Sequence, residues 1–193
     1  MPTAVVLSVT KYSDTGIIAH LYTADHGRMQ YVVYGNKYKP ILRPLSIIEY
    51  TFSKKNNAPS QMCTMSSASL LYTPQRIPMD VQRQCVAMFL AEVLLHTLRH
   101  PMSDQPLFDW LCQLIERLDK EDDICNLHLE FLLEYATYLG IGIDDTEHPG
   151  WFTPPTTRQE RQQRLRELCL YYSEHIEDFR SPKSLDVLME VFD

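Results

Sequence analysis

Apolar and polar positions alternate with a period of two along three short runs near the start of the chain, at residues 4–12, 16–23 and 28–35. The runs are rich in Val, Ile, Leu and Tyr, and turn-forming Asp, Ser and Gly residues separate them. This pattern predicts three β-strands joined by tight turns. Both faces of the runs are partly apolar, which is typical of a strongly curved sheet that closes into a small barrel. Two further strands are expected at 46–52 and 61–67.

Beyond residue 79 the apolar positions recur every three or four residues, which is the period of an α-helix. Asp80 is the expected N-cap of the first helix, Pro101 follows its end, and Gly140 is a C-cap signal. The pattern predicts five helices, at 80–100, 105–120, 124–139, 157–179 and 184–192.

The two patterns together predict the fold class, which is α+β multidomain: an N-terminal OB-fold β-barrel followed by an all-α helical bundle. The barrel domain is expected at 1–72 and the helical domain at 78–193, with Pro74 and Pro78 near the crossing between them. A small, basic, tyrosine-rich barrel is a common way to hold a single nucleic-acid strand.

Composition narrows the class of protein. The hydrophobic fraction of 45% is enough to fill a core. No apolar run approaches the length of a membrane span, and the N-terminus lacks a signal-peptide pattern, so a soluble cytoplasmic protein is expected. The five cysteines are scattered without a Cys-x-x-Cys pair, which favours reduced thiols and predicts no bound zinc or other cofactor. The chain has no nucleophile elbow, P-loop or His-Glu-x-x-His motif, so we expect no enzymatic activity.

Charge is distributed unevenly along the chain. Residues 1–60 hold seven Lys and Arg against three Asp and Glu, a balance of +4, whereas the remainder holds 11 against 22, a balance of −11, which together give the net charge of −7. A basic strand-rich module is thus fused to an acidic helical one. The basic module suits phosphates, and the acidic module more naturally faces protein.

The cations and two tyrosines of the basic module are therefore the candidate DNA-binding residues. Tyr34 and Tyr38 flank the basic loop and would stack on bases. The alternative is an ordinary solvated surface, with the tyrosines in the barrel core. The full candidate set is Lys11, Arg28, Tyr34, Lys37, Tyr38, Lys39, Arg43, Lys54 and Lys55.

Two groups in the helical module have a second interpretation. Glu92, His96 and His100 share one helix face, a spacing that a metal site would use, but no further ligand follows at a recognisable spacing and a structural role is favoured. Four arginines open the fourth helix and would bind an acidic peptide or phosphates, although a solvated helix start is favoured because glutamates lie among them. These arginines are Arg158, Arg161, Arg164 and Arg166.

Seven short sequence pieces occur along the chain in a recognisable order and spacing. They are Val5-Val6-Leu7, Tyr12-Ser13-Asp14, Gly35-Asn36-Lys37, Met88-Phe89-Leu90-Ala91-Glu92, Leu107-Phe108-Asp109-Trp110-Leu111, Tyr138-Leu139-Gly140 and Lys183-Ser184-Leu185. In this order and spacing they resemble the bacterial recombination mediator family RecO, especially its shorter Bacteroidetes-like forms. Two departures stand out. Many relatives carry a four-cysteine zinc module after the Leu-Gly helix, and none follows Gly140 here; the segment between Gly142 and Arg158 is also short for the family.

The resemblance implies a DNA repair and recombination mediator without catalytic turnover. Family members bind single- and double-stranded DNA through the OB-fold and anneal complementary strands. They pair with RecR, contact the acidic C-terminal tail of single-stranded-DNA-binding protein (SSB), and help to load RecA, so a cytoplasmic, nucleoid-associated location is expected. Two other functions stay open from the residues alone: an RNA-binding OB-fold accessory protein, and a protein–protein adaptor without nucleic-acid binding.

Overall fold

The computed structural model of the chain describes residues 1–53, 63–99 and 101–192. The packing divides the chain into two compact units. The first, which we call the barrel unit, comprises Met1–Gln75 and Leu98–Glu116, and the second, the helical unit, comprises Arg76–Thr97 and Arg117–Asp193. No helix in the described part of the chain is long and apolar enough to cross a membrane.

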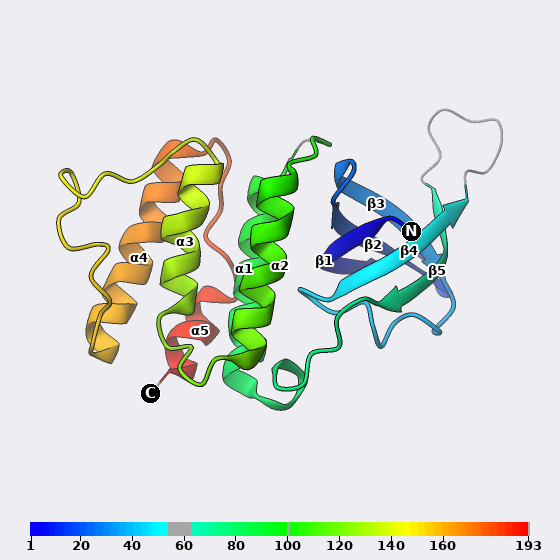
Figure 1. The fold of residues 1–193 in the computed structure, drawn as a ribbon, viewed down its shortest axis with the longest axis horizontal. Helices are drawn as coiled ribbons and strands as arrows, with labels where there is room; N and C mark the ends of the chain where they lie inside the picture. The colour runs from blue at the N-terminus through cyan, green and yellow to red at the C-terminus, as the bar shows by residue number, and fades with distance from the viewer. Residues whose placement is uncertain (54–62, 100, 193) are drawn as a thin grey trace. The chain divides into compact units, whose positions relative to one another are not determined.

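Five strands form a closed barrel in the barrel unit (Figure 1). Their order around the barrel is β1-β2-β3-β5-β4, and all neighbours are antiparallel except β3 and β5. The expected fold class is therefore confirmed, although the last strand lies three residues further along than predicted, because its Ser-rich sequence alternates too weakly to mark its ends. The strands are β1 (Thr3–Lys11), β2 (Gly16–Thr23), β3 (Gly27–Tyr34), β4 (Ile47–Ser53) and β5 (Thr64–Leu70).

The inward positions of the period-two pattern form the barrel core. Small and branched side chains such as Ala19, Leu21 and Val33 are fully buried there. Tyr31 and Tyr50 also lie inside, where their hydroxyl oxygens are 3.1 Å apart in a mutual hydrogen bond. Burial raises the pKa of both phenols, so each stays neutral and each satisfies the polar tip of the other.

The connection between β3 and β4 folds back onto this core. A tight turn over residues 36–41 directs the side chain of Leu42 into the core cluster, and Tyr38 and Ile41 pack against the same cluster. The Tyr38 hydroxyl donates a hydrogen bond of 3.1 Å to the carbonyl of Ser66 on β5. The loop therefore packs its apolar side chains against the barrel core and leaves its polar side chains at the surface.

A segment distant in sequence covers part of the outer barrel surface within the same unit. Arg28 Nη1 donates a hydrogen bond of 3.0 Å to the carbonyl of Leu98, and the Tyr22 ring lies 6.3 Å from the Phe108 ring. Gly27 has a φ of +66°, and a Cβ there would lie 2.1 Å from the Met102 carbonyl oxygen. The compact barrel unit thus includes residues 98–116, whereas the expected domain bounds, 1–72 and 78–193, stay a prediction.

Among the described residues, the helical unit contains four whole helices, the last turn of a fifth, and a short 3₁₀ turn, η1 (Ile77–Met79). Within it α1 packs against α3 and α5, and α3 lies beside α4 (Figure 1). The predicted helical bundle is confirmed; α2 begins and ends where its pattern predicted, and the other helices are shorter by a few residues at their ends. The helices are α1 (Val81–Thr97), α2 (Gln105–Lys120, which contributes residues to both units), α3 (Leu127–Tyr138), α4 (Arg158–His175) and α5 (Leu185–Val191).

Asp80 and Gly140 mark helix ends as the sequence predicted, and the structure adds a capping box that was not predicted, formed by Thr157 and Glu160. The Asp80 carboxylate accepts a hydrogen bond of 2.8 Å from the backbone N–H of Gln82, which caps α1. Thr157 and Glu160 form a reciprocal capping box at the start of α4. Gly140 has a φ of +74° just after α3, a backbone conformation that glycine adopts without the clash of a Cβ.

A buried arginine joins the ends of two helices in the helical unit. Only 1% of the Arg83 surface is exposed. Its guanidinium donates to the carbonyls of Leu118 and Glu121, which lie in and just after the last turn of α2, and its Nε lies 3.3 Å from the Asp80 carboxylate. The positive charge thus meets the unpaired carbonyls at a helix C-terminus, where a cation is favoured.

The residues considered for a metal site have a structural role. The Glu92 carboxylate accepts hydrogen bonds from the backbone N–H groups of Lys183 and Ser184 and from the Ser184 hydroxyl, at 2.8 to 3.0 Å. His96 Nδ1 lies 3.1 Å from the carbonyl of Arg180. The two side chains fasten the segment before α5 onto α1; His100 lies outside the described residues.

Candidate nucleic-acid interface

The outer face of β1, β2 and β3 is divided into a covered half and an open half. At the covered half, Tyr22 and Arg28 face each other across β2 and β3. Arg28 contacts Leu98, and Tyr22 contacts Asp104 and Phe108. Moving along the strands, the next outward pairs are His20 with Gln30, Ile18 with Val32, and Gly16 with Tyr34; Val32 among them is only 5% exposed. We call this uncovered part, with the adjoining β1–β2 turn, the open half-face.

Exposed aromatic rings lie at the far end of the open half-face. Tyr34 is 52% exposed and Tyr12 is 53% exposed. A Cβ on Gly16 would lie 3.3 Å from the Tyr34 ring, so a glycine at that position leaves room for the ring to lie against β2. The backbone N–H of Gly35 donates a hydrogen bond of 2.8 Å to the carbonyl of Thr15, which holds the end of β3 beside the β1–β2 turn. This end of the half-face therefore offers flat π-surfaces to solvent, as a base-stacking platform requires.

Cations adjoin the same end. Lys11 lies at the end of β1, and its Nζ is 3.8 Å from the Asp14 carboxylate in a fully solvated pair that contributes little to folding. Lys37 stands over the Tyr38 ring, with its Nζ 5.1 Å from the ring centroid. Lys39 and Arg43 are exposed on the loop that follows.

The two candidate tyrosines occupy different environments. Tyr34 is exposed on the open half-face, whereas Tyr38 packs against the barrel core and bonds to β5. Tyr38 therefore matches the core interpretation, and its ring supports Lys37 from below by a cation–π contact.

Two further parts of the candidate set lie elsewhere. Arg28 is at the opposite end of β3 from Tyr34, against the covering segment, where burial and the charge of Arg99 lower its pKa. Lys54 and Lys55 lie outside the described residues. Lys11, Tyr34 and the loop that carries Lys37 thus lie at the same end of the β1–β2–β3 sheet, and Arg28 lies at its opposite end.

Sequence reasoning missed Tyr12, His20 and Gln30. Thr10 Oγ1 and His20 Nε2 lie 3.2 Å apart on the half-face, and burial, followed by the charge of Arg28, lowers the pKa of His20, so this imidazole is neutral near pH 7. The signal that would have found His20 and Gln30 is the alternation of side chains along the two strands. Residues 18, 20 and 22 on β2 lie on the same side of the sheet as 30, 32 and 34 on β3 once the hairpin register is known.

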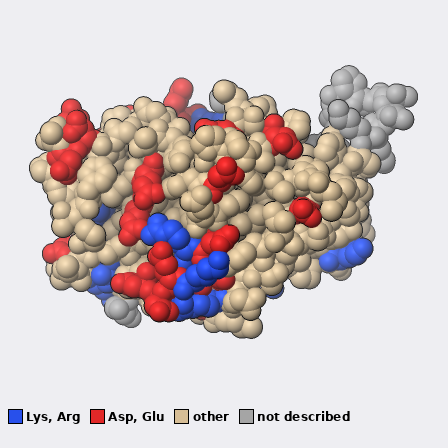
Figure 2. Space-filling model, viewed as in Figure 1, with Lys and Arg blue, Asp and Glu red and all other residues tan. Residues whose placement is uncertain are grey.

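Basic side chains of the helical unit offer no comparable patch on the face seen in Figure 2, where they lie among acidic ones. Arg117, for example, pairs with both Glu121 and Glu130 at 2.8 Å. On α4, Arg164 donates to the carbonyl of Trp151 and lies 3.7 Å from Glu167. These cations therefore form ion pairs with nearby carboxylates or donate hydrogen bonds to backbone carbonyls.

A pocket of about 350 Å³ lies between α1 and the start of α5. Its lining is mainly apolar, and Lys183 and Glu92 supply the charges. The Glu92 carboxylate accepts hydrogen bonds from the backbone of the segment before α5. The Lys183 ammonium takes no part in these hydrogen bonds, so it is the charged group at the pocket that would meet a ligand. The lining residues are Cys85, Met88, Glu92, Lys183, Ser184 and Val187.

Comparison with known families and proteins gives a consistent result. The family described as Recombination protein O N terminal matches residues 2–72, and Recombination protein O C terminal matches residues 78–148. Proteins named DNA repair protein RecO from Flavobacterium psychrophilum, Porphyromonas gingivalis and Bacteroides fragilis are each 28% identical to this chain. The matches cover 98% of this chain and 97%, 98% and 97% of those relatives.

The relatives are longer than this chain. The alignment with the Flavobacterium protein spans 233 positions against the 193 residues here, so at least 40 of its positions have no counterpart in this chain. The two family matches nonetheless follow the order of the structure, a five-stranded barrel and then helices, and together they cover most of the chain. The chain therefore belongs to the RecO family of recombination proteins.

Proposed function

We propose that this chain is a DNA repair and recombination mediator of the cytoplasm, acting at the nucleoid. In this proposal it binds DNA through the barrel unit and anneals complementary single strands. With RecR it then helps to load RecA onto single-stranded DNA coated by SSB. It does so by binding and positioning strands, without catalysis.

The observation that carries the proposal is the open half-face with its exposed rings and adjoining cations. Tyr12 and Tyr34 present π-surfaces that stack on bases without regard to sequence, and Lys11 and Lys37 lie where a phosphate backbone would pass. In OB-folds generally, the face of strands 2 and 3 and the adjoining loops bind oligonucleotides. The covering segment at Tyr22 and Arg28 leaves one end of this face for the strand.

The first test replaces Lys37 and Lys39 together by Ala. Each lysine that contacts a phosphate releases condensed counterion, about 0.7 per charge for single strands, so the slope of log affinity against log salt should flatten by roughly 1.4. Annealing of complementary strands should slow in parallel, and thermal stability should barely change because both side chains are exposed. Fluorescence anisotropy with labelled oligodeoxythymidine measures the slope.

A matched control keeps the change of charge but moves it off the barrel. Arg166 and Arg180 are exposed in the helical unit, and their double Ala variant should keep the wild-type slope. Equal slopes for the lysine double variant and wild type would place the DNA path elsewhere. Tighter binding to oligouridine than to oligodeoxythymidine would favour the RNA-binding alternative, and no binding of either at low salt would favour an adaptor.

We also propose that the pocket between α1 and α5 receives the acidic tail of SSB. Apolar walls suit an apolar terminal side chain, and Lys183 suits the neighbouring carboxylates by charge complementarity. Anisotropy of a labelled tail peptide should show saturable binding, weakened on the order of tenfold by Lys183→Glu at low salt. Arg180→Glu places the same charge change close by in sequence but outside the pocket lining and is the control; equal loss in both variants, or no binding at all, would contradict this pocket.

A further inference from the structure

One edge of β1 is only partly used by the barrel. On one side β2 lies along nearly the whole strand, whereas on the other side β4 pairs with Thr3–Val5 alone. The chain just before β4 extends this pairing by one residue: the N–H of Val6 donates to the carbonyl of Ser46, and the N–H of Leu45 donates to the carbonyl of Val6. Beyond that point, at residues 8–11, no described residue makes a backbone hydrogen bond with this edge.

The strand register shows which backbone groups face the open edge. The N–H of Tyr12 donates to the carbonyl of the first residue of β2, and hydrogen-bonded pairs alternate with other pairs along an antiparallel ladder. Two positions and four positions earlier, Thr10 and Ser8 are therefore also bonded to β2. The N–H and C=O groups of Val9 and Lys11 consequently point away from β2, toward the open edge.

The two residues before Ser46 explain why the chain leaves this edge. Leu45 has a φ of +61°, a left-handed backbone conformation that an L-residue with a large side chain rarely adopts. Only 3% of Leu45 is exposed, so the burial of its side chain and its hydrogen bond to Val6 hold it in this conformation. Pro44 precedes it and has no N–H to offer to β1. The pairing with β1 therefore ends at Val6.

The open edge is exposed and lies among cations. Val9 is 41% exposed, so an apolar side chain lies uncovered beside the free backbone groups. Lys11 is on the same side of the strand, and its Nζ is 3.8 Å from the carboxylate of the exposed Asp14. Arg43 is exposed in the turn that borders the edge, where its carbonyl accepts a hydrogen bond from the N–H of Ser46. A second copy of the chain at this edge would bring like charges together, whereas an acidic partner is complementary to it.

We propose that the open edge of β1 is a docking site for an extended acidic peptide of a partner protein, which adds to the barrel as a further strand. Its backbone exchanges hydrogen bonds with Val9 and Lys11. Side chains directly opposite each other in adjacent strands interact, so the peptide carries an apolar residue opposite Val9 and an acidic residue opposite Lys11. The peptide runs antiparallel to β1, as β4 does, so the acidic residue precedes the apolar one by two positions.

The test adds the capped peptide Thr-Glu-Thr-Val-Thr-Glu-Thr-Val to the full chain and follows backbone hydrogen exchange by NMR. In the free protein the amides of Val9 and Lys11 should exchange fast and those of Ser8 and Thr10 slowly, because only the latter two are bonded to β2. Saturating peptide should slow exchange at Val9 and Lys11 on the order of tenfold or more and leave Ser8 and Thr10 unchanged.

Two matched pairs separate strand addition from simple attraction of charge. Methylation of the peptide nitrogens of Glu and Val blocks the N–H groups that face β1 and should abolish binding, whereas methylation of the Thr nitrogens, which face away, should keep it. Lys11→Glu should weaken binding on the order of tenfold at low salt. Arg166→Glu makes the same charge change at an exposed position of the helical unit and should leave binding unchanged.

Equal binding of the two methylated peptides, equal weakening by the two variants, or unchanged exchange at Val9 in saturating peptide would overturn the proposal. Exchange at Val9 that slows with protein concentration in the absence of peptide would identify a second copy of the chain as the occupant, and would overturn it as well. Lys11 also adjoins the open half-face, but the readout is the backbone of Val9, so a failure of DNA binding by the barrel leaves this test intact.

Discussion

Two tyrosines close together in the sequence of the barrel unit differ in what surrounds their rings. Tyr34 is half exposed on the open half-face, whereas Tyr38, four positions later, packs on the core and donates to the carbonyl of Ser66. We therefore expect the same residue type to serve recognition at Tyr34 and folding at Tyr38. Burial of the ring and the partner of its hydroxyl separate the two roles.

A pair of substitutions tests this at the scale of the residue. Tyr34→Ala should weaken binding of single-stranded DNA by roughly 1–3 kcal/mol, the contribution of one stacked base, with little change in stability. Tyr38→Ala should instead destabilise the barrel, by about 3 kcal/mol for the lost ring packing and hydrogen bond. Urea denaturation and anisotropy measure the two effects. The assignment would be wrong if Tyr38→Ala left stability unchanged and removed binding.

At the scale of the element, a close approach of two backbones explains one glycine. Gly27 begins β3 with a positive φ, and any Cβ there would overlap the backbone of Met102 at 2.1 Å. Gly35 follows the last residue of the same strand with a similar φ of +77°, but nothing lies within 4 Å of the position that its Cβ would take. Both positions require a positive φ, but only at Gly27 does a neighbouring backbone leave no room for a Cβ.

Replacing each glycine by Ala separates these two costs. Gly35→Ala should cost about 1–2 kcal/mol, the strain of a left-handed backbone for an L-residue. Gly27→Ala should cost that much and in addition the displacement of residues 98–104, so it should be the more destabilising of the two. Urea denaturation gives the difference, and hydrogen exchange should show faster exchange near Met102 in Gly27→Ala alone. Equal costs would mean that the covering segment yields freely.

At the scale of the whole molecule, one buried histidine couples stability to pH. The pKa of His128 is lowered to about 3, first by burial and then by the charge of Arg161. An unfolded histidine titrates near about 6.5, so below that pH the unfolded chain binds a proton that the folded chain does not. Stability is therefore full above about pH 6.5 and falls as the pH falls toward 3, by up to about 1.4 kcal/mol per pH unit.

The measurement is the free energy of unfolding between about pH 7 and pH 5 in phosphate-free buffer. His128→Phe keeps an aromatic ring against Phe192 but cannot take up a proton, so its stability should fall less steeply with pH than that of wild type. The exposed His26 offers the control, since His26→Gln should keep the wild-type slope. Parallel curves for wild type and His128→Phe would show that this histidine does not carry the effect.

The sequence by itself determined the elements, because the forces that choose them are local. Alternation in residues 4–35 and the three-to-four-residue period beyond 79 each reflect which side of one strand or helix is buried. Asp80, Thr157 and Gly140 mark helix ends by bonds or backbone angles within a few residues. The sequence also predicted the positive charge of the β3–β4 loop, because the charge of an exposed lysine does not depend on its tertiary contacts.

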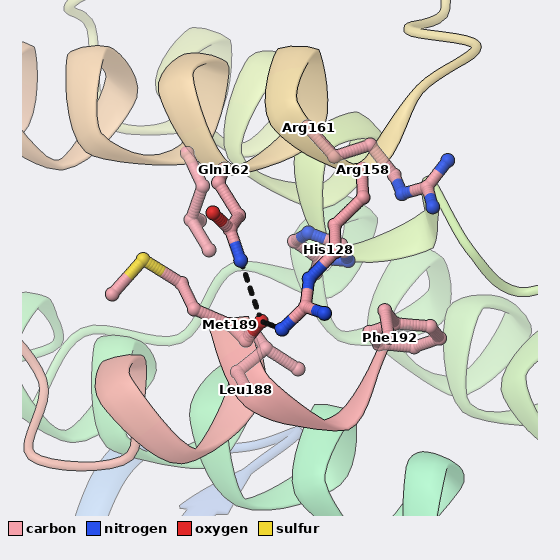
Figure 3. Close-up of a pocket in the computed structure, with 8 residues that line it drawn as sticks. His128, Arg158, Arg161, Gln162, Leu188, Met189 and Phe192 are labelled. Carbon is pink, nitrogen blue, oxygen red and sulfur yellow. Dashed lines mark hydrogen bonds between the residues drawn. The ribbon is translucent and has the colours of Figure 1, made fainter.

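The tertiary structure alone decided which of these residues meet. In the sequence, Arg28 is indistinguishable from the other candidate DNA-binding cations. Only the structure shows that its guanidinium donates a hydrogen bond to the carbonyl of Leu98, which is 70 residues away in the chain. His20 and Gln30 share a face with Tyr34 only through strand register, and His128 and Arg161 line one cavity only because α3 packs beside α4 (Figure 3). Contacts between positions so far apart depend on how the whole core packs, and no local pattern of apolar and polar residues records them.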